Sequence, residues 1–412
     1  MWHLAPSGTP IRMADIAELA GDVISRRRKL ERFRDAVCAS FGVRHCFFVS
    51  SGRAAMTLVL RAFKALSNGR KTEVIVPSYT CYSVPASIRK AGLTVRVCDV
   101  DPATFGYDHC RLERMDFSNV LCIVTSNLYG IPDDLEAVER IASRHGVRLL
   151  DDAAQCMGAR VGERFSGTFG DAGIFSLDKG KNVTTIEGGI IVTRFQQMAE
   201  TLRGETATLP SSDFSGNITT FLKTIFYAVF LRPRLYWIPN RLPFLGLGST
   251  AYSEEYAVEK YRPFLSGLGI RLLDRLREIN NARIENAEFL MKMLEGTPHL
   301  VLPVIGDNAT PVYLRFPVRI FDQERRNRCI ARLNRFGISA SPSYPGAVND
   351  IPEVRTRLRE EETFMPCGRT LAKQIVTLPT HPYVRREDLV MMVDILRQEC
   401  AKETLFGVPT KQ

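Results

Sequence analysis

The stretch from residue 170 to residue 193 reads GDAGIFSLDKGKNVTTIEGGIIVT, and it decides the fold class. Its two apolar runs, 172–177 and 190–193, have the composition of buried strands. A short polar loop that carries Lys181 separates them. The residues that flank the lysine are small and polar, which suits a binding site better than a solvated surface; they are Ser176, Asn182, Thr184 and Thr185.

The residues alone permit two interpretations of Lys181. A lysine that is held among small polar groups and partly desolvated has a lowered pKa, so it can form a Schiff base with an aldehyde cofactor. The alternative is an ordinary lysine whose charge stays in water. Spacing alone leaves both interpretations open.

Length and composition indicate a large soluble protein. The 412 residues can bury a sizeable core, and two domains are expected. Apolar residues make up 45% and charged residues 24%, which is usual for globular proteins. The formal charge of +10 fits an anionic substrate such as a phosphate or nucleotide ester, or an acidic membrane surface. The sequence has no helix-turn-helix, zinc-finger or RNA-binding signature, so we expect no nucleic-acid partner.

The cysteines and the first residues bear on the compartment. The ten cysteines lack C-x-x-C or other metal-ligand spacing, so we expect reduced thiols and no metal. The opening sequence MWHLAPSGTPIRMADIAEL has no apolar core behind a basic end, so we expect no signal peptide. A cytoplasmic protein is the simplest expectation.

A phosphate-binding turn is expected near residue 52. A strand at 45–50 runs through Ser-Gly into a helix at 54–66. Such a turn presents free backbone N–H groups and the positive end of a helix dipole. Gly52, Arg53 and Ala54 are therefore candidate cofactor-binding residues, although many strand–helix turns look alike.

Strands and helices alternate beyond this turn at the spacing of a parallel sheet that is covered on both faces. Sites in such sheets lie beyond the carboxyl ends of the strands. Tyr129 and Asp152 both follow expected strands, so we place them at one edge of the sheet with the Ser-Gly turn. The expected strands are 73–77, 94–100, 120–126 and 147–150, with a crossover helix at 133–145.

Asp152 lies in the sequence DDAAQ directly after a strand. A carboxylate at the end of a buried strand is costly unless it has a partner. A protonated pyridine nitrogen is such a partner, and the ion pair keeps the ring an electron sink. The alternative is a helix N-cap for the next segment.

Several motifs together resemble the DegT/DnrJ/EryC1/StrS aminotransferases. The longest is F-S-x-x-x-x-K-N-x-T-T-x-E-G-G-x-x-x-T at 175–193; D-x-A-Q at 152–155 and F-x-P-C-x-R-T-L-A at 364–372 are two more. The resemblance implies an α/β protein of the fold-type I class that depends on pyridoxal phosphate. It implies a large domain with a mostly parallel sheet flanked by helices and a smaller C-terminal α+β domain.

The resemblance also implies roles for matched residues. Lys181 binds the cofactor, and the K-N-x-T-T register prefers it to Lys179. Asp152 pairs with the ring nitrogen, and Gln155 lies on the ring face. The remaining implied contacts are Ser176 and the turn Gly52, Arg53 and Ala54 with the cofactor phosphate, and Tyr129 and Tyr344 with the substrate.

Two positions depart from the family pattern. Arg53 replaces the usual threonine of the phosphate-binding turn, so a hydroxyl is lost while the backbone donors remain. The family's G-y-N-x-R segment supplies an asparagine to the neighbouring subunit's cofactor phosphate, and residues 261–267 offer no equivalent. A homodimer is nevertheless what the family implies.

The implied reaction moves an amino group from an amino acid, L-glutamate in most members, to a keto-sugar that is mostly nucleotide-linked. Such reactions serve the biosynthesis of surface glycans or natural products. Lys181 would move the proton as general base and then as acid. Because histidine replaces this lysine in the branch that removes a sugar hydroxyl, Lys181 favours amino transfer.

Residues 215–248 contain no acidic residue and mix aromatic with basic side chains. Apolar residues at 221, 222, 225, 226 and 229 form one helical stripe, and the apolar run is too short to span a bilayer. The pattern is typical of a helix in a membrane interface, so peripheral membrane contact through 219–248 is one hypothesis. A stripe buried in a dimer interface, or a lid, is the other.

The chain thus divides into four expected parts. They are an N-terminal helical segment (1–40), a large cofactor-binding domain (41–214), an insertion (215–262), and a linker helix at 272–294 with a small domain (263–412). Two rival functions stay open beside the sugar aminotransferase. One is a pyridoxal-phosphate enzyme for a non-sugar or lipid-linked ketone, and the other is a non-catalytic sensor or scaffold.

Overall fold

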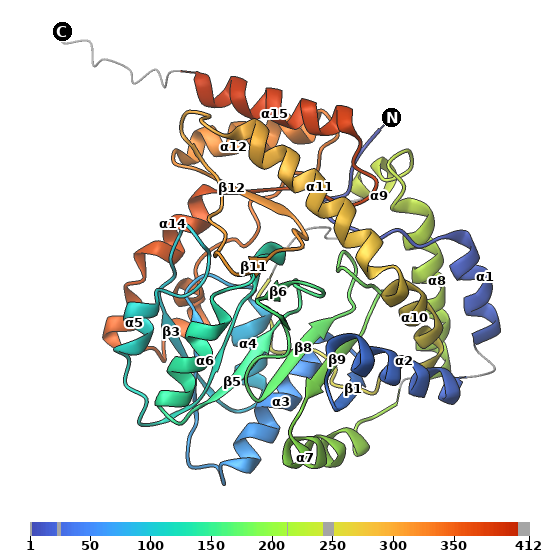
Figure 1. Ribbon diagram of the computed structural model, residues 1–412, viewed down its shortest axis with the longest axis vertical. Coiled ribbons are helices and arrows are strands. Elements are labelled where there is room, and N and C mark those ends of the chain that lie inside the picture. The colour runs from blue at the N-terminus through green and yellow to red at the C-terminus, as the bar shows by residue number, and fades with distance from the viewer. Residues whose placement is uncertain (1, 23–25, 212, 242–250, 403–412) are drawn as a thin grey trace.

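The central sheet has seven strands among the residues that the structure describes (Figure 1). The structure is a computed structural model that describes residues 2–22, 26–211, 213–241 and 251–402. All strand pairs from β8 to β3 are parallel, and β9 runs against both of its neighbours, which confirms the predicted mostly parallel sheet. In spatial order the strands are β1 (His45–Val49), β9 (Gly189–Thr193), β8 (Ala172–Ser176), β5 (Arg148–Asp152), β4 (Val120–Val124), β2 (Glu73–Pro77) and β3 (Thr94–Cys98).

Alternation along the strands sends side chains into two apolar layers. Val74 and Val76 of β2 pack on one face with α3 (Gly52–Leu66) and α4 (Ser83–Lys90). Ile75 between them packs on the other face against side chains of α5 and α6. The remaining helices of these layers are α7 (Gln196–Ala207) beside α3, and α2 (Arg26–Phe41), α5 (His109–Glu113), α6 (Leu135–Arg144) and α10 (Ser266–Asp274) on the opposite face.

The C-terminal part forms a smaller α+β domain. Its three-stranded antiparallel sheet has the order β10 (Leu300–Val301), β12 (Phe316–Ile320) and β13 (Ile375–Leu378) among the described residues. Figure 1 shows this domain above the central sheet, with α11 running from one to the other. Its helices are α11 (Leu276–Leu294), α12 (Gln323–Arg335), α14 (Pro366–Gln374) and α15 (Arg386–Ala401), whereas α13 (Pro352–Arg355) packs through Val354 into the layer of α3 and α4.

Shorter elements complete the described chain. A second three-stranded sheet in the described residues pairs β11 (Ala309–Thr310), β6 (Arg160–Val161) and β7 (Arg164–Phe165). The other helices are α1 (Met13–Asp22), α8 (Phe214–Phe230) and α9 (Trp237–Asn240). The 3-10 turns are η1 (Leu128–Gly130), η3 (Pro263–Leu265), η4 (Val348–Asp350) and η5 (Glu360–Thr363).

Two predicted boundaries are wrong. The helix expected at 272–294 is interrupted at Arg275, where α10 ends and α11 begins. The sequence also predicts a strand at 311–318, and this strand begins at Phe316 instead. The residues before it turn away from the small sheet, since Val312 N–H donates to the Gly130 carbonyl at 2.8 Å and Tyr313 has a φ of 41°.

The insertion forms helix α8, which packs in an unexpected way. Its buried residues are small: Thr220, Thr224 and Ala228. The large apolar side chains of the predicted stripe are only partly covered, and Leu222 is 58% and Phe226 43% exposed. The stripe is therefore not buried within the subunit, and the predicted alternatives of a membrane interface, a dimer interface or a lid all stay open.

No helix of the described residues, α8 included, is long and apolar enough to cross a bilayer. Residues 242–250, which belong to the predicted membrane-contact segment, lie outside the described residues.

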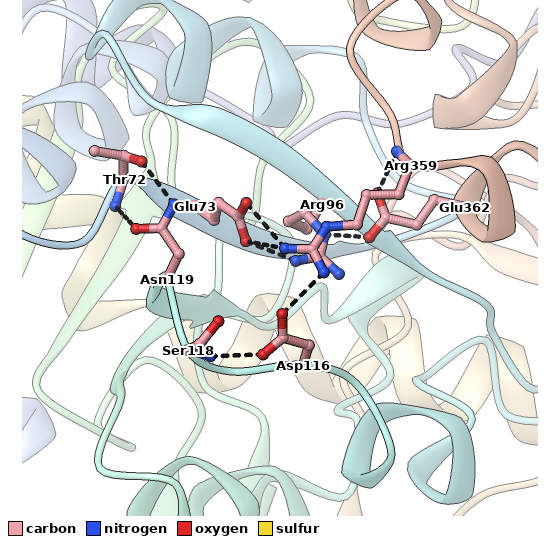
Figure 2. A network of polar contacts seen from close by, with 8 residues as sticks. All are labelled: Thr72, Glu73, Arg96, Asp116, Ser118, Asn119, Arg359 and Glu362. Atoms are coloured by element: carbon pink, nitrogen blue, oxygen red, sulfur yellow. Dashed lines mark hydrogen bonds and ion pairs between the residues drawn. The ribbon is translucent and has the colours of Figure 1, made fainter.

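A network of ion pairs joins β2 and β3 to the C-terminal domain (Figure 2). The Arg96 guanidinium lies between Glu73, at 2.6 Å, and the buried Glu362 of η5. Arg359 contacts Glu73 at 3.2 Å and Asp116 at 3.0 Å. Each buried charge thus has a partner of opposite sign, as burial requires.

Candidate active site

A cavity of about 840 Å³ lies between the carboxyl ends of β4 and β5, the loop after β8 and helix α8. Five of the residues that the sequence indicated line this one cavity: Tyr129, Asp152, Gln155, Lys181 and Tyr344. The rival lysine, Lys179, lines it too but is exposed. Parallel strands end at a common edge, and this explains why residues far apart in the sequence meet here.

Asp152 is positioned by the turn that follows β5. Its Oδ1 accepts a hydrogen bond from Ala154 N–H at 3.0 Å, which resembles the capping alternative. Among the described residues no donor reaches Oδ2, so this oxygen is open to the cavity. Burial raises the pKa of Asp152 to about 6, and the Ala154 N–H and the Lys181 charge act in the opposite direction. A cation would therefore stabilise the ionised form.

The neighbouring Asp151 has a different environment. Its carboxylate is fully buried and accepts hydrogen bonds from four groups: Thr125 Oγ1, Asn127 Nδ2, Gly167 N–H and Phe169 N–H. These four hydrogen bonds fill the acceptor positions of the two carboxylate oxygens. Asp151 is therefore a structural residue that fixes the end of β5, and Asp152 is the carboxylate that faces the cavity.

Gln155 links the two tyrosines of the predicted substrate site. Its Oε1 accepts from Tyr129 N–H at 3.0 Å, and its Nε2 donates to the Tyr344 hydroxyl at 2.7 Å. The Tyr129 hydroxyl donates to Ser343 Oγ at 3.0 Å. Burial raises the pKa of both tyrosines, so they stay neutral and can act as hydrogen-bond donors.

The predicted phosphate-binding turn at the start of α3 and Ser176 are outside the cavity lining. They adjoin it at Asp178 of the cavity wall, whose N–H donates to Ser176 Oγ at 3.3 Å. A Cβ on Gly52 would stand 3.0 Å from the Ser176 Cβ, so glycine permits the close approach of the turn to β8. Ala54 N–H already donates to Ser51 Oγ at 3.1 Å. The Arg53 guanidinium is exposed and lies 4.7 Å from the centre of the Tyr256 ring, outside the cavity lining. What remains for an anion is the positive helix end and the Ser176 hydroxyl.

The loop that carries Lys181 is held by the N-terminal segment, which the sequence did not indicate. Ser7 Oγ donates to the Gly180 carbonyl and Thr9 Oγ1 donates to the Lys181 carbonyl, each at 2.6 Å. These two bonds fix the backbone carbonyls of Gly180 and Lys181, and so hold the loop at the lysine. No local pattern marks Ser7 or Thr9, because their partners lie far along the chain.

Helix α11 contacts the same loop through Asn280. Asn280 Oδ1 accepts from Asn182 Nδ2 at 2.9 Å, and Asn280 Nδ2 donates to the Met157 carbonyl. Arg283 is fully buried and donates to the carbonyls of Gly8 and Leu314. The sequence predicts a polar side of this helix at Asn280, Arg283 and Asn286, and the structure buries Asn280 and Arg283.

Helix α8 forms the outer wall of the cavity. Thr219, Leu222, Phe226 and Phe230 line it together with Lys223 and Tyr227. The alternative interpretation of the insertion as a lid is consistent with this position. Asp213 caps the helix, and Arg262 contacts both Asn217 of α8 and Glu187 of the lysine loop.

Comparison with known proteins agrees with this geometry. The profile of the DegT/DnrJ/EryC1/StrS aminotransferase family matches residues 12–214 and 252–397. The chain therefore belongs to this family and is a pyridoxal-phosphate-dependent aminotransferase. The match leaves out residues 215–251, which include all of α8 except its first residue, Phe214.

Individual relatives are similar over most of their length. A UDP-N-acetyl-3-dehydro-alpha-D-glucosamine 3-aminotransferase of Acidithiobacillus ferrooxidans is 26% identical over 87% of this chain and 85% of its own. A "pleiotropic regulatory protein" of Geobacillus stearothermophilus is 34% identical over 81% of this chain and 80% of its own. The solved structure of S. venezuelae DesV in complex with a ketimine intermediate has a TM-score of 0.77 and 25% identity, covering 95% of this chain and 96% of DesV.

The residues of the cavity fit pyridoxal phosphate. Asp152 offers an open oxygen that lacks a donor in the described part of the chain and gains from a cationic nitrogen. Lys181 supplies an amine in the same cavity, and the start of α3 with Ser176 supplies an anion site beside it. These three groups match the ring nitrogen, the aldehyde and the phosphate of the cofactor.

Proposed function

We propose that this protein transfers an amino group from an amino acid, L-glutamate, to a keto-sugar that is nucleotide-linked, in the biosynthesis of a surface glycan or natural product. One observation carries the proposal: Lys181 and the open carboxylate of Asp152 line the same cavity, and the charge of Lys181 acts on Asp152. Intact groups of this kind are what amino transfer requires, and they speak against a purely structural scaffold.

The predicted site residues have separate tasks in this reaction. Pyridoxal phosphate, when bound, supplies the electron sink. Asp152 holds the ring nitrogen protonated, and Ser176 with the start of α3 holds the phosphate. The Lys181 amine acts first as a general base, which takes the proton from Cα of the donor, and then as a general acid, which gives a proton back. Gln155 keeps its position through Tyr129 and Tyr344.

The substrate class is supported by charge and by relatives. The formal net charge of +10 attracts an anionic ester. Two further relatives, each 26–27% identical over at least 90% of this chain, are named as transaminases of dTDP-linked amino sugars.

The test begins with the visible spectrum of the protein loaded with pyridoxal phosphate, before and after L-glutamate. We expect a visible band that bleaches with glutamate. Borohydride reduction followed by peptide mapping should then place the cofactor on Lys181. Lys181→Ala should abolish the band, whereas the matched variant Lys179→Ala should retain it. A cofactor on Lys179, or no bleaching with any amino donor, would favour the sensor or scaffold.

A second candidate, an aminotransferase for a lipid-linked ketone, is favoured by the outer face of α8. Phe214, Ile218, Leu222 and Phe226 are spaced four residues apart and are 75%, 46%, 58% and 43% exposed. Leu222 and Phe226 also line the cavity, so the exposed stripe is continuous with it. Residues 214–241 contain no acidic residue and four basic ones, which are Lys223, Arg232, Arg234 and Arg241. Such a surface suits an anionic lipid bilayer.

A further inference from the structure

Arg315 lies in the residues that turn away from the small sheet just before β12, and its side chain reaches the cavity. Its backbone is fixed there, since Arg315 N–H donates to the Tyr129 carbonyl at 3.4 Å. Within the described ranges no carboxylate, carbonyl or hydroxyl accepts a hydrogen bond from its guanidinium. The titratable groups that interact with its charge are the phenols of Tyr129, Tyr236 and Tyr344, the guanidinium of Arg283 and the ring of His381, and none of them is a carboxylate.

An arginine in this position is costly. Burial lowers the pKa of Arg315, which means that the charged form is poorly solvated. A desolvated charge needs a partner of opposite sign or several hydrogen bonds. Arg315 has neither within the described chain, although a guanidinium carries five N–H donors.

Arg283 provides the contrast within the same region. It is fully buried, and its guanidinium donates to the Gly8 carbonyl at 2.6 Å and to the Leu314 carbonyl at 3.1 Å. Its hydrogen bonds are made inside the protein, so Arg283 is structural. The donors of Arg315 are directed to the cavity, where an acceptor has to come from a ligand.

The charges of the cavity wall agree with an anionic ligand. Four cationic side chains line it in the described residues, against the two carboxylates of Asp152 and Asp178. The four are Lys179, Lys181, Lys223 and Arg315. A cavity with an excess of one sign of charge concentrates ligands of the other sign.

We propose that Arg315 binds an oxyanion of the substrate, a carboxylate or a phosphate, within the cavity that holds Lys181. The inference rests on the proposed function, because it takes this cavity as the place of reaction. A planar guanidinium binds either group through two parallel hydrogen bonds. The oxyanion has two possible sources: the carboxylate of the amino donor, or the anionic ester of the acceptor.

The first experiment measures binding without catalysis. Protein saturated with pyridoxal phosphate, so that the cofactor's own phosphate site is filled, is titrated calorimetrically with inorganic phosphate and with glutarate. Arg315→Gln should weaken the affinity for the bound anion about 10- to 100-fold, the range that hydrogen bonds to charged groups supply. Arg315→Lys should recover part of it, because it restores the charge but not the paired geometry.

Arg319→Gln is the matched control. Arg319 lies four residues along the same strand segment, donates to Gln374 Oε1 at 3.2 Å and is outside the cavity lining. The Arg319→Gln variant should bind both anions as tightly as the wild type does. Thermal unfolding separates binding from structure: Arg315→Gln should keep or raise Tm, since it removes a charge without a partner, whereas loss of a structural arginine lowers Tm.

The second experiment identifies the source of the oxyanion. The glutamate half-reaction is followed in single turnover, and the complete reaction is followed with a nucleotide-linked keto-sugar at saturating glutamate. If Arg315→Gln raises only the apparent Kd of glutamate, the oxyanion is the carboxylate of the donor. If it raises only the KM of the acceptor, the oxyanion is the acceptor's anionic ester.

The inference is overturned if the wild type binds neither anion, or if Arg315→Gln binds both as tightly as the wild type. It is also overturned if the variant loses affinity only in proportion to a fall in Tm that Arg315→Lys fails to restore. A failure of the proposed function looks different, because a protein that carries no cofactor on Lys181 can still show phosphate binding that depends on Arg315.

Discussion

The hydroxyl of Tyr129 donates to Ser343 Oγ at 3.0 Å, and both residues have a positive φ, 62° and 67°. Tyr129 follows β4 of the large domain, and Ser343 belongs to the small domain. A backbone conformation of this kind is costly for a residue with a side chain and persists where the surroundings impose it. Two strained turns, one from each domain, thus meet through one hydrogen bond in the wall of the cavity.

This bond should couple the domains and serve activity. Tyr129→Phe removes the hydroxyl, and Ser343→Ala removes its acceptor. In a double-mutant cycle we expect a coupling free energy of about 0.5–1.5 kcal/mol in urea unfolding, as for a net hydrogen bond. Additive effects would show that the contact contributes nothing to stability. Ser343→Gly, which relieves the strain but lacks the hydroxyl, should be more stable than Ser343→Ala.

Cofactor affinity should fall in acid because of Asp152. Burial raises the pKa of this carboxyl to about 6, so it takes up a proton as the pH falls through that value and can no longer pair with a cationic nitrogen. We expect the Kd for pyridoxal phosphate to rise below about pH 6 in the wild type. Asp152→Asn should bind weakly with a flat profile from pH 5 to 8, whereas Asp178→Asn, on the same cavity wall, should keep the wild-type profile.

The same carboxyl should also affect the stability of the cofactor-free protein, with a defined sign. Its pKa is higher in the folded than in the unfolded chain, so the folded state binds the proton more tightly. The contribution to stability is present below the unfolded value near 4 and is lost as the pH rises through about 6. We therefore compare the free energy of unfolding of cofactor-free Asp152→Asn with that of the wild type at two pH values. The difference in favour of the variant should be about 1–3 kcal/mol larger at pH 7.5 than at pH 4. A constant difference across this range would contradict the assignment.

The outer face of α8 should bind anionic membranes if the acceptor is lipid-linked. We expect the protein to sediment with vesicles that contain phosphatidylglycerol and not with vesicles of phosphatidylcholine alone. Phe214→Glu with Ile218→Glu, both outside the cavity lining, should abolish this binding. Val390→Glu on α15, which is 44% exposed, is the matched control. If the double variant instead converts a dimer to a monomer in light scattering, the stripe belongs to a subunit interface.

The ion pairs of Figure 2 should stabilise the junction of the domains. Glu362 is buried against Arg96, so Glu362→Gln leaves that guanidinium with Glu73 alone. We expect a loss of about 2–4 kcal/mol in the free energy of unfolding, as for breaking a buried pair. Glu361→Gln, at an exposed neighbouring position, should change it by less than about 0.5 kcal/mol. The spectrum of the bound cofactor should be unchanged, because the network is outside the cavity lining.

The parallel sheet and the residues on its edge were predictable because local sequence determines them. An apolar strand followed by Asp152, or a polar loop around Lys181, is visible in a few consecutive residues, and parallel topology then brings them together. Arg315 was not predictable, since it stands in an apolar run and reaches the cavity only because Val312 bonds to Gly130. The side of α8 that packs on the rest of the subunit was not predictable for another reason: small residues, and not the large apolar ones, make its buried contact.

The anchoring of the lysine loop by the N-terminal segment has a consequence for synthesis of the chain. Thr9 holds the Lys181 carbonyl, and that segment is itself held by Arg283 at Gly8 and by His381, whose ring nitrogen bonds the Ala5 carbonyl across 376 positions of sequence. Contacts of such high sequence separation form late. Residues 5–9 must therefore wait for residue 381 before the reactive lysine has its final support, so a nascent chain stopped short of residue 381 should hold the cofactor loop less firmly.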